Sequence, residues 1–79
     1  MYYVYSIQSE SNPDKYYVGL TTNTEKRLAE HNAGKSIHTN KFRPWKINTY
    51  TAFADKSRAE KFEAYLKTSS GRAFAKKRL

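Results

Sequence analysis

The feature that most constrains the fold is a two-residue alternation of side chains at the start of the chain. Residues 1–7 place Tyr3, Tyr5 and Ile7 on one side of an extended backbone and the remaining side chains on the other. Tyrosine, valine and isoleucine favour strands, because aromatic and β-branched side chains pack well on a pleated surface. The alternation therefore predicts a β-strand over residues 1–7.

Two further segments favour strands, and a turn separates the first of them from residues 1–7. Asn12-Pro13-Asp14 is a turn signal, because proline fixes φ near the value that the second turn position requires. Residues 15–21 then predict a second strand, which we expect to pair with the first as an antiparallel hairpin. Residues 45–53 alternate again and predict a third strand.

The pairing register of the hairpin decides whether two tyrosines meet. One register places Tyr5 and Tyr17 on the same face of the sheet, and a slip of one residue would separate them. The sequence alone leaves both registers open.

A first helix is expected after the second strand. Thr22-x-x-Glu25 fits a capping box, in which the hydroxyl and the carboxylate each accept a backbone N–H at the helix start. Gly34 suits the left-handed residue that ends such a helix. Residues 35–44 are polar and basic and predict a loop.

Two more helices are expected after the third strand. Ser57-x-x-Glu60 is a second capping box, and Ser69-Ser70-Gly71 predicts a break before a short basic helix over 72–78. The order β-β-α-β-α-α indicates an α+β fold, with a small three-stranded antiparallel sheet flanked by helices. We expect residues 1–79 to form one domain.

The charge of the chain favours a polyanionic partner. There are 15 Lys and Arg residues against 7 Asp and Glu, a net charge of +8. Such a bias favours nucleic acid of some kind. The chain lacks cysteine, and no apolar stretch approaches the ~20 residues that span a bilayer, so we expect a cytoplasmic protein without a membrane partner. The expected phosphate contacts are Lys41, Arg43, Arg72 and Lys76.

Three side chains suggest phosphate chemistry, although each also has an ordinary structural role. Arg27 and His31 are four residues apart and share a helix face. The guanidinium of Arg27 could bind a phosphate, and the imidazole of His31 could transfer a proton. Glu63 lies beside the apolar stripe of its helix, where a carboxylate is costly to desolvate unless a cation meets it. The alternatives are a solvated arginine, a histidine at a helix C-terminus, and a glutamate paired with Lys67.

This set of residues resembles the GIY-YIG nuclease family. The two signature tripeptides would lie at Tyr3-Val4-Tyr5, where tyrosine replaces the usual glycine, and at Tyr17-Val18-Gly19. Residues 27–34 are similar to the family's first helix, and residues 59–67 to its metal-binding helix. Residues 39–45 and 70–74 look like the small stand-alone bacterial members.

The resemblance implies metal-dependent hydrolysis of DNA phosphodiester bonds, as in relatives that act in DNA repair. Tyr5 and Tyr17 would place the attacking water and the scissile phosphate, Arg27 would stabilise the pentavalent phosphate, and His31 would assist proton transfer. Glu63 would be the sole protein ligand of one Mg²⁺ or Mn²⁺ ion. Relatives usually borrow specificity from an attached DNA-binding domain, so a partner subunit is a further expectation. The competing hypotheses are a non-catalytic nucleic-acid-binding module that retains the fold, and a docking subunit of a larger complex.

Overall fold

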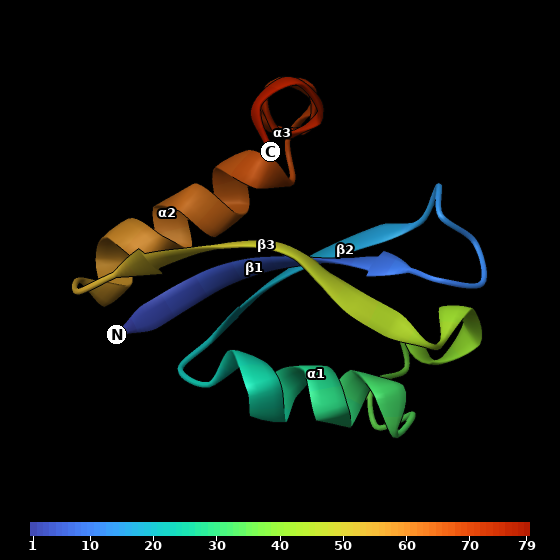
Figure 1. Cartoon of the computed structure of the whole chain (residues 1–79). Helices are drawn as coiled ribbons and strands as arrows, with labels where there is room; N and C mark the ends of the chain where they lie inside the picture. Colours follow the sequence, from blue (N-terminus) through green and yellow to red (C-terminus); the bar gives the residue numbers. More distant parts are fainter.

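The sheet has three antiparallel strands with β1 in the centre. A computed structural model describes all 79 residues. The strand order is β2-β1-β3, and helices cover both faces (Figure 1). The predicted α+β fold and the predicted order β-β-α-β-α-α are confirmed. In chain order the elements are β1 (Tyr2–Ser9), β2 (Tyr16–Thr21), α1 (Thr24–Asn32), the short 3₁₀ helix η1 (Asn40–Phe42), β3 (Trp45–Phe53), α2 (Lys56–Leu66) and α3 (Ser69–Arg78).

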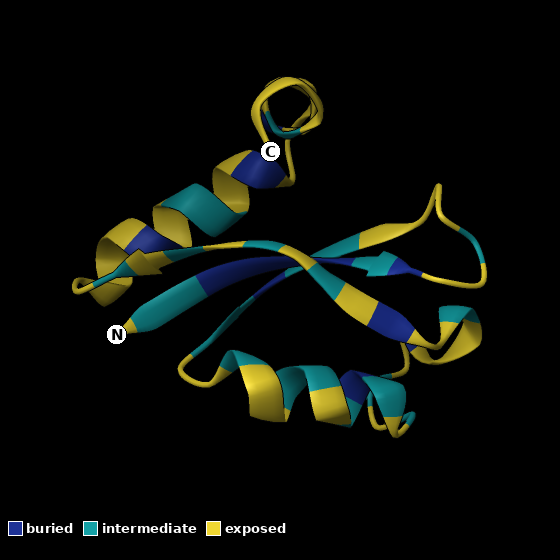
Figure 2. Ribbon diagram, viewed as in Figure 1, coloured by how far each residue is buried: buried dark blue, intermediate teal, exposed yellow.

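The central strand contributes side chains to two separate apolar clusters. Val4 packs with Ala59 and Leu66 beneath α2, whereas Tyr5 packs with Trp45 and neighbours on the side of α1. Figure 2 shows that the longest buried stretch of the sheet lies on β1. Burial of each large apolar side chain stabilises the fold by roughly 1.5–3 kcal/mol. Side chains of β1 are buried on both faces of the sheet, and this packing fixes the strand and therefore the position of Tyr5.

The hairpin register brings the two tyrosines of interest to one face. Tyr5 is opposite Gly19, and Ile7 is opposite Tyr17, in the pairing of β1 with β2. Residues opposite one another in an antiparallel pair share a face, and faces alternate along each strand. Tyr5 and Tyr17 therefore lie on the same face, which is the face that α1 covers.

The predicted capping residues of the first two helices are wrong. Asn23, not Thr22, caps α1 by accepting the N–H of Lys26 at 3.0 Å. Asp55, not Ser57, caps α2. Asn and Asp are among the strongest N-cap residues, so each replaces the hydroxyl that the capping-box pattern favoured. The prediction for Gly34 is correct, since its φ is +78°.

The predicted break at residues 69–71 is also wrong, because α3 begins at Ser69. The Thr68 side chain accepts the N–H of Gly71 at 3.0 Å and caps the helix. A Cβ on Gly71 would collide with the backbone carbonyl of Tyr65. The glycine therefore lets α3 approach the end of α2 closely, rather than interrupting a helix.

Candidate functional site

The centre of the site is a hydrogen-bonded cluster of a phenol, an imidazole and a guanidinium. The Tyr5 hydroxyl lies 2.8 Å from His31 Nε2, and Arg27 Nε donates to the Tyr5 oxygen at 3.3 Å. Arg27 and His31 reach the same atom because they are one turn apart on α1. Both Tyr5 and His31 are almost completely buried.

His31 has a second partner that the sequence did not suggest. Its Nδ1 lies 2.7 Å from Thr39 Oγ1, and Thr39 is completely buried. The indole N–H of Trp45 donates to the Thr39 carbonyl at 2.8 Å and fixes this part of the loop. Thr39 belongs to a polar segment that reads as an exposed loop, and only its position shortly before Pro44-Trp45 hints at burial.

Tyr17 completes the aromatic part of the site. Its ring centroid lies 5.3 Å from that of His31 in an edge-on arrangement. Tyr5 reaches the β2 edge because Gly19 has no side chain, and a Cβ there would occupy the space of the Tyr5 hydroxyl. The structure therefore brings Tyr5, Tyr17, Arg27 and His31 together.

Burial and the charge of Arg27 set the protonation of this cluster. Burial raises the pKa of Tyr5, and the hydrogen bond from Arg27 acts against that rise. Burial lowers the pKa of His31, and the nearby Arg27 lowers it further. His31 is therefore neutral at neutral pH. On the outer side, Glu30 accepts a hydrogen bond from Arg27 at 3.1 Å, which lowers the pKa of Glu30.

Glu63 comes from α2, on the opposite side of the sheet from α1. Its carboxylate is 3.4 Å from Lys67 Nζ, and its side chain is 25% exposed. Burial is the largest cause of the raised pKa of Tyr5, and the charge of Glu63 makes the smallest contribution to that rise. Glu60 does not close a capping box, because Asp55 caps the helix, and it is exposed. Half-burial and proximity to Tyr5 distinguish Glu63 from Glu60.

The donor set limits the kind of cation that fits. No group of three or more His, Asp or Glu side chains gathers anywhere in the chain. A single carboxylate cannot enclose Zn²⁺, which takes three or four protein ligands. It fits Mg²⁺ or Mn²⁺, since such a hard ion keeps several waters and takes phosphate oxygens from a substrate. Glu63 is available for this role because a lone lysine is its only partner.

The four basic residues expected at phosphates lie on two different surfaces. Lys41 Nζ sits 5.6 Å from the Phe42 ring centroid, and Arg43 donates to the carbonyls of Asn40 and Asn32. Arg72 and Lys76, by contrast, line an open groove of about 870 Å³ between α3 and the β1–β2 hairpin.

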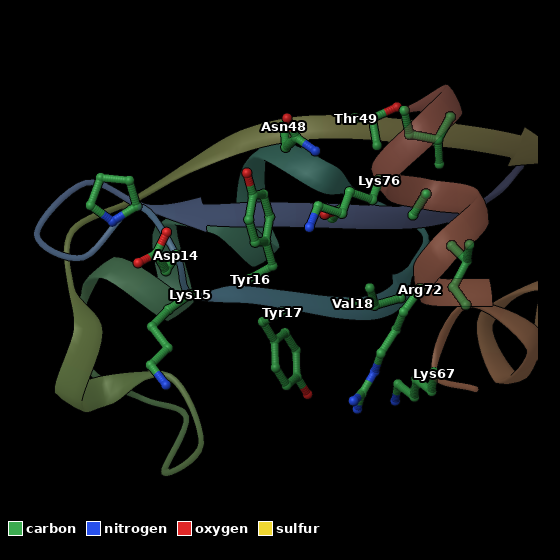
Figure 3. A pocket seen from close by; sticks show the side chains of 15 residues that line it. Asp14, Lys15, Tyr16, Tyr17, Val18, Asn48, Thr49, Lys67, Arg72 and Lys76 are labelled. Atoms are coloured by element: carbon green, nitrogen blue, oxygen red, sulfur yellow. The ribbon is translucent and has the colours of Figure 1, made fainter. Parts of the chain in front are cut away.

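This groove adjoins the site at the edge of β2. Figure 3 shows the side chains of Tyr17, Lys67 and Arg72 extending toward the same side. Lys76 points toward Tyr16, whose side chain is exposed on the other face of β2 (Figure 3). Because Tyr17 also contacts His31, the groove and the buried cluster share one residue.

None of the helices combines the length and apolar character needed to cross a bilayer.

Comparison with known proteins identifies relatives over almost the whole chain. The model of the GIY-YIG catalytic domain matches residues 1–78. A UPF0213 protein of Staphylococcus haemolyticus is 40% identical over 70 residues, which cover 87% of this chain and 83% of the relative. A UPF0213 protein of Listeria welshimeri is 42% identical over 60 residues, which cover 75% of this chain and 67% of the relative.

A third relative is named for an activity but shares less of its length. It is the structure-specific endonuclease subunit SLX1 of Scheffersomyces stipitis, which is 40% identical over 52 residues. The match covers 58% of this chain and 16% of that protein. The match of the domain model across residues 1–78, together with the small UPF0213 relatives, shows that this chain belongs to the GIY-YIG nuclease family.

Proposed function

We propose that this chain is a divalent-metal-dependent endonuclease that hydrolyses DNA phosphodiester bonds. The observation that carries the proposal is the buried contact of Tyr5 with His31 and Arg27, beside Tyr17 and within electrostatic reach of Glu63. A buried tyrosine usually finds a single hydrogen-bond partner for its hydroxyl. Two nitrogen groups converge on the Tyr5 oxygen instead, and this arrangement suits an oxygen that carries or receives charge during a reaction.

Each residue of the cluster has a distinct task in this proposal. Tyr5 orients the attacking water, and Tyr17 positions the scissile phosphate. Arg27, whose Nε donates to the Tyr5 oxygen, stabilises charge on the pentavalent phosphate. His31 holds the Tyr5 hydroxyl through a hydrogen bond and assists proton transfer from the water. A Mg²⁺ or Mn²⁺ ion on Glu63 would neutralise phosphate oxygens as a Lewis acid.

The name of one relative supports a substrate with structural features and a partner subunit. The relative from Scheffersomyces stipitis is named a structure-specific endonuclease and a subunit. We infer that this chain acts on DNA structures or with low sequence specificity, in DNA repair or processing. The groove that Arg72 and Lys76 line is where we place the DNA backbone.

A second candidate is a non-catalytic module that binds nucleic acid, RNA included. It is favoured by the ion pair of Glu63 with Lys67, which gives the carboxylate a role without metal. It is also favoured by Tyr16, which is 54% exposed in the groove and available for stacking on an unpaired base.

One experiment separates the two candidates. Plasmid, branched and single-stranded DNA are incubated with the chain in Mg²⁺, in Mn²⁺ and in EDTA. We expect cleavage with metal, its loss in EDTA, and its loss in Glu63→Gln. Glu60→Gln is the matched control, because Glu60 lies on the same helix and is exposed. Binding without cleavage under every metal condition would favour the module, and full activity of Glu63→Gln would refute the metal role.

A further inference from the structure

The Thr39 hydroxyl has one hydrogen-bond partner, and that partner is His31 Nδ1 at 2.7 Å. A hydroxyl carries one proton to donate. Thr39 is completely buried, so this proton cannot be shared with bulk water. Leaving a buried donor without an acceptor is unfavourable, and hydroxyl protons in proteins therefore turn toward the acceptor that is available.

The position of this proton determines the tautomer of His31. If Thr39 donates to Nδ1, that nitrogen carries no hydrogen, and the neutral ring carries its hydrogen on Nε2. Nε2 is the atom that lies 2.8 Å from the Tyr5 oxygen. His31 then donates to Tyr5, and Arg27 Nε donates to the same oxygen at 3.3 Å.

The opposite arrangement leaves a different proton without an acceptor. If His31 carried its hydrogen on Nδ1, Tyr5 would donate to Nε2 and the Thr39 proton would be buried without an acceptor. In the favoured arrangement it is the Tyr5 proton that has no protein acceptor. Tyr5 is the group of the two that the proposed reaction addresses, since it lies beside Tyr17 and within reach of the charge of Glu63.

We propose that Thr39 is a positioning residue that fixes the Nε2–H tautomer of His31, so that the imidazole is a hydrogen-bond donor to the Tyr5 oxygen. With two N–H donors on it, this oxygen keeps its own proton free to hydrogen-bond the attacking water, and the donors stabilise negative charge that develops on it. Trp45 holds the Thr39 backbone through its indole N–H, which keeps the hydroxyl in place. Both the choice of tautomer and the role in hydrolysis rest on the proposed function, and the tautomer is measured independently of activity.

The tautomer is measured directly by nitrogen NMR on the ¹⁵N-histidine-labelled chain, at a pH where His31 is neutral. Protonated and unprotonated ring nitrogens have distinct resonances, and His38 is assigned by its loss in His38→Gln. We expect His31 to hold its hydrogen on Nε2. A resonance pattern with the hydrogen on Nδ1 would overturn the proposal, whatever the activity of the chain.

Variants of Thr39 test the positioning role. Thr39→Val removes the hydroxyl at nearly constant volume, shifts the Nδ1 resonance and lowers the cleavage rate constant by about 5- to 150-fold at unchanged KM, as expected for loss of one buried hydrogen bond. Thr39→Ser keeps the hydroxyl, so we expect it to retain the wild-type Nδ1 resonance and cleavage rate constant. Thr51→Val is the matched control, because the Thr51 side chain makes no hydrogen bond in the structure. An unchanged Nδ1 resonance and full activity in Thr39→Val would contradict the role.

The two proposals fail in distinguishable ways. A chain with the Nε2–H tautomer that cleaves no DNA keeps the assignment of Thr39 and removes the proposed function. A chain that cleaves DNA with the Nδ1–H tautomer removes only the role of Thr39.

Discussion

The absence of a side chain at Gly19 determines where the Tyr5 hydroxyl lies. Gly19 has no left-handed φ, so its backbone would accept alanine without strain. A methyl group there would nevertheless fall within the space of the Tyr5 hydroxyl and the adjacent ring carbons. In Gly19→Ala either the ring leaves His31 and Arg27, or β2 moves away from β1. Either response costs about 1–3 kcal/mol, by overpacking or by loss of hydrogen bonds.

The assay is a double-mutant cycle in urea. We expect Gly19→Ala to lower the free energy of unfolding by about 1–3 kcal/mol in the wild-type background, with a fall in Tm of about 4–8 °C per kcal/mol. In a Tyr5→Leu background the same substitution should cost less by at least ~1 kcal/mol, because the phenol is gone. Leu66→Ala, in the cluster under α2, is the control background and should leave the cost unchanged. Equal costs in the wild-type and Tyr5→Leu backgrounds would refute the steric explanation.

Three further predictions concern protonation, packing and binding. Burial lowers the pKa of His31, so the unfolded chain takes up a proton on this residue at a higher pH than the folded chain does. The free energy of unfolding should therefore decrease as the pH falls from about 7 to about 5. Urea titrations of His31→Gln should lack this decrease, and a profile unchanged by the substitution would contradict the prediction. Gly71→Ala should lower the free energy of unfolding by about 1–3 kcal/mol in thermal denaturation, since its methyl group would meet the carbonyl at the end of α2; a Tm equal to that of the wild type would show that α3 moves freely. DNA binding is measured by fluorescence anisotropy with duplex DNA in EDTA. Arg72→Ala and Lys76→Ala should each reduce the slope of log K against log salt by about 0.9, whereas Arg43→Ala should not, because Arg43 bonds backbone carbonyls. Equal slopes in all three variants would show that the groove does not bind DNA.

The strands were predictable from the sequence, but their register was not. Alternation of side chains is a local property, and it placed all three strands within a few residues of their observed ends. Register is specified when one face of a strand is apolar and the other polar. Residues Val4 to Ile7 of β1 are all buried, so both faces carry core side chains and neither register is disfavoured by polarity.

The helix boundaries show a different limit. Several residues near each start can cap a helix, and the choice between Thr22 and Asn23, or between Ser57 and Asp55, is decided by small differences in free energy. At Gly71 the composition indicated a break, but the contact with Tyr65 that explains this glycine is made between two helices. A local pattern does not contain that information.

The candidate site was predictable in its members and not in its connections. The spacing of Arg27 and His31 placed them on one helix face, and Glu63 stood out beside the apolar stripe of its helix. The resemblance added the roles of Tyr5 and Tyr17. The hydrogen bond between Tyr5 and His31 joins residues 26 positions apart, so it depends on how α1 packs on the sheet. Thr39 was missed for the same reason, since its burial follows from the packing of Trp45 on the loop.

The central claim is that Glu63 from α2 meets the tyrosines of the sheet around one divalent ion. Titration of the ¹⁵N- and ¹³C-labelled chain with Mn²⁺ tests it, because the paramagnetic ion broadens the NMR signals nearest to it. The account predicts broadening centred on Glu63 that extends to Tyr5 and Tyr17, and its loss in Glu63→Gln but not in Glu60→Gln. Broadening centred elsewhere, or broadening that persists in Glu63→Gln, would contradict it.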